Sequence, residues 1–244
     1  MDRLNLSHHI SRQYNEELEN VRGQVLKMGG IVEQQMAEAV QALVAGDSEL
    51  ARQVVTNDYR VNALEVAIDE ECTRIVARRQ PAASDLRLVM AVIKTISDLE
   101  RIGDEAKRVA KMVVEQLSGT VNEEVRQEFE HMGALVRDML RSVLEAFART
   151  DVATAMAVVR QDARVDAKYG SITRQLMTYM AEDPRAIPMM LNILWAVRAM
   201  ERIGDRCTNI AEYIFYLVHG RDIRHISRED VAQGLAAGTE EGRD

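Results

Sequence analysis

The sequence predicts an all-α fold of two tandem, pseudo-symmetric three-helix bundles, built from six long antiparallel helices. The 244 residues include three prolines and thirteen glycines, too few for the frequent turns of an all-β fold or the glycine-rich loops of an α/β fold. Apolar residues recur every third or fourth position over long stretches, as on one face of an amphipathic helix. The second half also repeats a series of residues from the first, which indicates an internal duplication.

Three helices account for the first half of the chain. Apolar positions between Leu18 and Leu43 predict a helix over about residues 13–45. The segment 46–48, Gly-Asp-Ser, ends this helix and caps the next one. The second helix continues to a connector at residues 80–84, and the third runs from there to residue 117. We therefore expect a first bundle over residues 1–118.

The second half follows the same plan. Its apolar stripes run over residues 125–146, 158–176 and 190–218. After Gly220 the stripe fades, and the last residues are polar and acidic, which is typical of a flexible segment. We expect a second bundle over residues 119–220 and a flexible tail over residues 221–244.

The duplication can be followed residue by residue. The sequence Glu-Arg-Ile-Gly-Asp occurs at residues 100–104 and again at residues 201–205. At an offset of 104 residues, Asp58 corresponds to Asp162 and Asn62 to Asp166. Matches in the same order within similar helices indicate a duplicated three-helix unit.

The repeated carboxylates suggest metal binding. Asp58 and Asp162 each occupy a position in an apolar stripe, where a lone buried carboxylate would normally neutralise or find a cation. If the second and third helices of each half are antiparallel, Asp58 lies level with Asp104, and Asp162 with Asp205. By the same geometry Asn62 faces Glu100, and Asp166 faces Glu201. Oxygen ligands of this kind suit Mg²⁺, Mn²⁺ or Ca²⁺, and iron less well, because no imidazole or thiolate is supplied.

Salt bridges are the alternative interpretation of the same acids. Arg101, Arg108, Arg202 and Arg206 lie within one helical turn of them and are able to pair with them. Gly103 and Gly204 lie mid-helix, where a glycine costs about 1 kcal/mol relative to alanine. This indicates close approach of a neighbouring helix, which suits packing and metal binding equally well.

The composition excludes several function classes. The net charge of −8 disfavours nucleic-acid binding, which needs a basic face. No glycine-rich phosphate loop and no nucleophile with a neighbouring base is present, so we expect no catalytic residues. The longest uncharged run, residues 186–197, is too short to cross a bilayer. The N-terminal residues lack the apolar core of a signal peptide, so a cytoplasmic location is expected.

Three further residues are expected to pack in the core. Cys72 and Cys207 lie on apolar stripes and have no paired spacing, so we expect two buried thiols without a disulfide. Trp195 flanks the stripe position Val197 and is also expected to be a packing residue.

The duplicated motifs resemble those of the PhoU family. The resemblance covers roughly residues 18–218 and rests on Glu-Arg-Ile-Gly-Asp in the last helix of each unit, on Met28-Gly29, and on the segment 80–87. It implies two three-helix bundles, a homodimer, and metal ions on the acidic helix motifs. Matched by position, the implied metal ligands are Asp58, Glu100, Asp104, Asp162, Asp166, Glu201 and Asp205. Asn62 departs from the acidic pattern, so the first-half site is the weaker of the two.

The resemblance also implies a function. It predicts a non-enzymatic regulator that represses phosphate uptake and the phosphate-starvation response by coupling the ATPase of an ABC phosphate importer to a sensor histidine kinase. No organic cofactor is implied, and the divalent metal could be magnesium, manganese, iron or zinc. The membrane would be reached only through these partners. The alternative is a carboxylate-rich metalloprotein or metal-dependent enzyme, although the chain has one Glu-x-x-His sequence, at Glu128 and His131, where di-iron bundles need two.

Overall fold

The computed structural model describes residues 12–116 and 122–223, and every regular element within these ranges is helical. This confirms the predicted all-α fold. The elements are α1 (Arg12–Ala45), α2 (Ser48–Asn57), α3 (Tyr59–Arg79), α4 (Ala83–Gln116), α5 (Glu123–Arg149), α6 (Val152–Glu182), the 3₁₀ turn η2 (Pro184–Ala186) and α7 (Ile187–His219). The predicted boundary at residue 118 and nearly all of the predicted tail lie outside the described residues.

Equivalent residues end the first helix of each half in the same way. Gly46 and Thr150 both adopt the left-handed conformation, with φ of +66° and +54°, and so stop the helix. The aspartate that follows then caps the next helix. Asp47 accepts hydrogen bonds from the backbone of residues 49 and 50, and Asp151 from that of residues 153 and 154. The repeat in sequence is therefore a repeat in local structure.

The single helix predicted between residues 48 and 79 is divided into two helices, α2 and α3. The break between α2 and α3 falls at Asp58. Its backbone stays in the right-handed helical region, and its carbonyl oxygen accepts from Val61 N at 3.0 Å. This hydrogen bond spans three residues, as in a 3₁₀ turn, and it interrupts the α-helix locally while α3 continues from α2. In the second half, α6 runs past Asp162 without a break.

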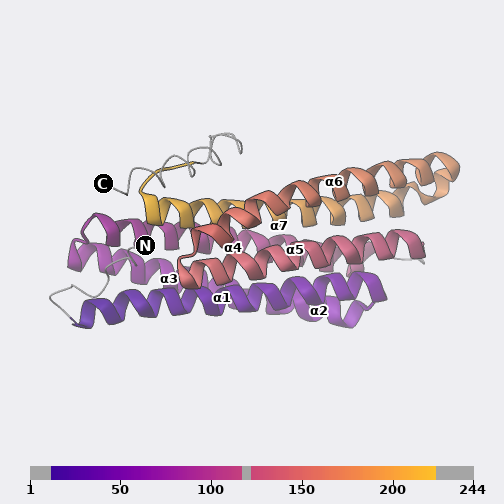
Figure 1. Ribbon diagram of the computed structural model, residues 1–244. Helices are drawn as coiled ribbons and strands as arrows, with labels where there is room; N and C mark the ends of the chain where they lie inside the picture. The colour runs from indigo at the N-terminus through magenta and orange to yellow at the C-terminus, as the bar shows by residue number, and fades with distance from the viewer. Residues whose placement is uncertain (1–11, 117–121, 224–244) are drawn as a thin grey trace, which may run out of the picture.

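The two halves pack side by side through matching helices. The axes of all the long helices lie roughly along the length of an elongated molecule (Figure 1). In the first half α1, α2, α3 and α4 pack together, and in the second α5, α6 and α7 do. The halves meet where α4 packs on α7 and α1 packs on α5. One continuous cluster of buried apolar residues draws on both halves.

A local twofold relation governs the contact between α4 and α7. Glu105 contacts Arg202, Asp98 contacts Asn209, and Lys94 lies over the ring of Tyr213. Residue numbers thus rise along α4 as they fall along α7, so the helices are antiparallel. The two Glu-Arg-Ile-Gly-Asp motifs consequently lie at the same level, near the middle of this interface.

The buried and exposed residues agree with the sequence prediction in all but one of the positions singled out. Cys72 and Cys207 are both buried free thiols, as predicted. Trp195, by contrast, is 60% exposed, and Ile187 and Leu191 on the same face of α7 are also exposed, so its prediction as a packing residue was wrong. No helix in the described part of the chain is long and apolar enough to cross a membrane.

Candidate functional site

Asp58 is a buried carboxylate that is paired with a cation and a hydrogen-bond donor. It is 2% exposed. Its Oδ2 lies 2.6 Å from Nζ of Lys107, and its Oδ1 accepts a 2.9 Å hydrogen bond from Nε2 of Gln35. The Asn62 amide is a more distant neighbour, with Nδ2 3.5 Å from Oδ2. A buried carboxylate is stable only with partners of this kind, and α1 and α4 each supply one.

Glycine allows the neighbouring helix to approach these aspartates. A Cβ at Gly103 would lie 3.2 Å from Oε1 of Gln35 and 3.7 Å from Oδ1 of Asp58. A Cβ at Gly204 would lie 3.3 Å from Oδ1 of Asp162. These short distances confirm the close helix approach that the two mid-helix glycines predicted.

Three further acids surround Asp58 and complete what we call the first acidic cluster: Asp58, Glu65, Glu100 and Asp104. Burial, followed by the negative charges of Asp104 and Glu65, raises the pKa of Glu100 to about 6. Asp104 is half exposed, and its Oδ1 lies 3.5 Å from Nζ of Lys107. The Lys107 ammonium therefore contacts two of the four carboxylates.

The second acidic cluster comprises Asp162, Asp166, Glu201 and Asp205. Asp162 is 4% exposed, whereas Asp166 and Asp205 are exposed. Burial, followed by the charge of Asp205, raises the pKa of Glu201. Although the Asp205 side chain reaches solvent, partial desolvation of its carboxylate, followed by the charge of Asp166, raises its pKa. The four carboxylates are thus close enough to interact electrostatically, as the antiparallel geometry predicted.

Glu201 has one paired oxygen and one unpaired oxygen. Nη1 of Arg198 donates to its Oε1 at 2.7 Å. Its Oε2 is buried and has no hydrogen-bond partner among the described residues. A buried carboxylate oxygen without a donor is costly. The second cluster therefore carries negative charge that is only partly compensated.

Neither cluster is a ready-made coordination shell. Within residues 12–116 and 122–223, no three His, Cys, Asp or Glu side chains are grouped so that they could hold a metal ion. The structure does place the seven predicted ligands in two groups, one at the break between α2 and α3 and on α4, and the other on α6 and α7. Their role as metal ligands stays a prediction.

A third charged group joins the two halves at the interface of α4 and α7. Asp98 is 2% exposed and accepts from the Tyr213 hydroxyl at 2.9 Å. It also accepts from Arg206 at 3.3 Å and from Asn209 at 3.4 Å. Sequence reasoning missed Asp98 because its equivalent in α7 is Ala199, so the comparison of the repeats did not reveal it.

The family comparison agrees with the duplicated structure. The PhoU domain model matches residues 25–113 and again residues 129–214. The chain belongs to the PhoU family.

Relatives of this PhoU-family chain match it over nearly its whole length. It is 52% identical to the phosphate-specific transport system accessory protein PhoU of Edwardsiella tarda over 96% of both chains. It is 50% identical to the protein of that name from Escherichia coli K12, over 97% of this chain and 98% of the other. These names belong to the relatives, and the coverage shows that nearly the whole chain is shared.

Solved PhoU structures share the fold. The crystal structure of PhoU from Pseudomonas aeruginosa matches with a TM-score of 0.82 and 50% identity, over 85% of this chain and all of that one. The phosphate transport system regulatory protein PhoU from Streptococcus pneumoniae matches with a TM-score of 0.78 at 29% identity, over 86% of this chain and 98% of that one.

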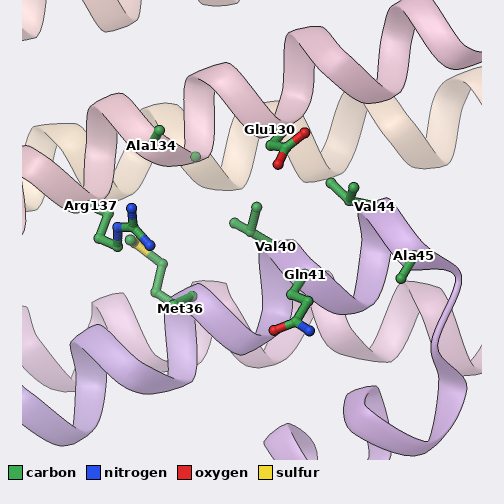
Figure 2. Close-up of a pocket in the computed structure, with 10 residues that line it drawn as sticks. Met36, Val40, Gln41, Val44, Ala45, Glu130, Ala134 and Arg137 are labelled. Atoms are coloured by element: carbon green, nitrogen blue, oxygen red, sulfur yellow. The ribbon is translucent and has the colours of Figure 1, made fainter.

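The PhoU-family chain also has a groove between α1 and α5. Its volume is about 370 Å³, and its lining includes Met36, Val40, Val44, Glu130 and Arg137. Figure 2 shows Glu130 and Arg137 projecting from α5 toward the apolar side chains of α1. One carboxylate and one guanidinium among mostly apolar side chains do not form a catalytic arrangement.

Two partners of Asp58 were missed because neither residue type is repeated in the second half. Gln35 corresponds to Met139, at an offset of 104 residues, and Lys107 corresponds to Thr208, at an offset of 101. The search for repeated acids could not detect them.

Proposed function

We propose that this chain is an accessory regulator of a phosphate-specific transport system. The observation that carries the proposal is the match over nearly the full length of relatives bearing that name, at 50–52% identity. The two PhoU domain matches, one in each half, agree with it. No catalytic arrangement among the described residues favours a different role.

The proposed mechanism is a protein contact and not a reaction. The chain would act as a homodimer in the cytoplasm, holding a sensor histidine kinase and the ATPase of an ABC phosphate importer in their repressed states while phosphate is plentiful. Long helices packed on one core supply rigid faces for such contacts. The net charge of −8 suits docking onto basic surfaces of the partners.

A deletion strain tests this proposal. Without the protein, the phosphate-starvation response should switch on at high phosphate, and an alkaline-phosphatase reporter should rise several-fold over the parent strain. A plasmid copy of the wild-type chain should restore repression. A reporter that stays silent in the deletion strain, in a cell with that importer and kinase, would contradict the proposal.

We also propose that the second acidic cluster binds a divalent metal ion. The partly compensated charge around Glu201 supports this, since Asp166 and Asp205 are exposed side chains that could rotate toward it. A metal ion there would neutralise the cluster and tie α6 to α7. Glu201→Gln combined with Asp205→Asn should lower Mn²⁺ binding in titration calorimetry and leave the helix content unchanged. Equal binding by the double variant would contradict the site.

A further inference from the structure

We propose that the Lys107 ammonium is a built-in cation that closes the first acidic cluster to divalent metal ions. The two halves would then differ: in the first, a lysine of the chain already pairs with the buried aspartate, and only the second would take up an added ion. The part that concerns the second half rests on the metal binding proposed above. The part that concerns Lys107 stands on the contacts of the first half alone.

The position of Lys107 carries the inference. Its Nζ lies 2.6 Å from Oδ2 of Asp58 and 3.5 Å from Oδ1 of Asp104, so one ammonium contacts both aspartates that were predicted to share a metal ion. A divalent ion binds carboxylate oxygens at about 2.0–2.6 Å. An ion that bridged these two aspartates would occupy the space of the ammonium, and the two positive charges would repel each other.

The second oxygen of Asp58 is also engaged. Nε2 of Gln35 donates to Oδ1 at 2.9 Å and lies 3.3 Å from the Gly103 carbonyl oxygen. Gln35 and Asp58 are 5% and 2% exposed. A metal ion would therefore have to displace a buried amide as well as the lysine, and both displaced groups would lose hydrogen bonds.

The second half lacks both of these donors. The positions of Gln35 and Lys107 are taken there by Met139, which cannot donate a hydrogen bond, and by Thr208, which carries no charge. The Thr208 hydroxyl is buried and has no hydrogen-bond partner among the described residues. Arg198 is the cation paired with Glu201, and its side chain is 40% exposed. It therefore pairs with its acid at the rim of the cluster.

The equivalence of positions 107 and 208 gives a reciprocal experiment. Lys107→Thr places in the first half the residue that the second half already has. In Mn²⁺ titration calorimetry it should bind one equivalent more than the wild type, because buried Asp58 has lost its cation. Adding Asp58→Asn to Lys107→Thr should abolish that extra equivalent. Thr208→Lys should lose whatever equivalent the wild type binds in its second half.

A second variant at position 107 keeps the experiment informative if Lys107→Thr does not fold. Lys107→Met keeps most of the aliphatic side chain and removes the ammonium group, so it should show the same extra equivalent if Lys107→Thr fails to fold. With either variant, Mn²⁺ should raise the melting temperature by more than it does in the wild type. Circular dichroism checks that each variant retains its helices.

The outcomes separate this inference from the metal site of the second half. If neither position-107 variant binds an extra Mn²⁺, or if the wild type already binds one that Asp58→Asn abolishes, the inference is wrong. If the wild type binds none and Lys107→Thr binds one, the closure by Lys107 is supported, and the second-half metal site fails on its own.

Discussion

At the scale of single residues, the acidic positions have different energetic roles despite their repeated sequence. Asp58 is buried and paired with Lys107 and Gln35, so its charge is satisfied. Glu100 is half-buried and surrounded by other acids, and its pKa is raised to about 6 by burial first and by Asp104 next. A repeated motif thus does not by itself fix the charge state of its members, because the neighbours outside the motif decide it.

Glu100→Gln should stabilise the protein at neutral pH. The folded state holds the Glu100 proton up to about pH 6, whereas the unfolded chain loses it near the ordinary value. The contribution of this group to stability is therefore complete at low pH and lost as the pH rises through 6. With solvent screening taken into account, we expect a gain of about 1 kcal/mol for the variant above pH 7 and little difference near pH 4.5.

Urea unfolding at several pH values measures this gain. Glu115→Gln is a suitable control, because it removes the same charge from an exposed position of α4. A variant that gains equally at pH 5 and at pH 7.5, or gains nothing at pH 7.5, would contradict the proposed origin of the effect.

At the scale of the helices, the antiparallel register could be predicted from the sequence, but the helix break could not. The antiparallel arrangement predicted Asp58 and Asp104 at the same level, and Lys107 contacts both. The break at Asp58 has no proline or glycine to mark it. Its Val61–Asp58 hydrogen bond occurs beside the buried carboxylate, whose partners come from α1 and α4 and are distant in sequence.

The helix interface between the halves offers a second test at this scale. Asp98→Ala removes an acceptor that Tyr213, Arg206 and Asn209 share across the interface. We expect a loss of about 2–4 kcal/mol in unfolding free energy. Asp98→Asn should lose less, because its amide oxygen can still accept from Tyr213.

Denaturant titration of the two Asp98 variants distinguishes the contact from a general effect. A double-mutant cycle with Tyr213→Phe should show coupling between the two residues, since they share a hydrogen bond at 2.9 Å. Strictly additive losses would mean that Asp98 contributes mainly through its other partners.

At the scale of the whole molecule, the duplication produces two halves that share one core. The buried cluster includes residues of α1 and α4 as well as α5 and α7. The interface between α1 and α5 is reciprocal: a Cβ at Gly29 would clash with Leu144, and a Cβ at Gly133 with Val40. Leu144 and Val40 are equivalent positions at the offset of 104, so each half offers a glycine to the branched side chain of the other.

This reciprocity predicts that separated halves recognise each other. Residues 1–118 and 119–244, produced separately, should each be mainly helical, because each has a complete set of amphipathic helices. Each should also be less stable than the whole chain, since separation exposes the apolar faces of α4 and α7. Mixed in equal amounts, the two fragments should form a one-to-one complex on size-exclusion chromatography and melt at a higher temperature than either alone. Gly133→Leu should weaken that complex, because its side chain would meet Val40 in the interface. Fragments that fold fully and form no complex would instead mean that the shared core contributes little to holding the halves together.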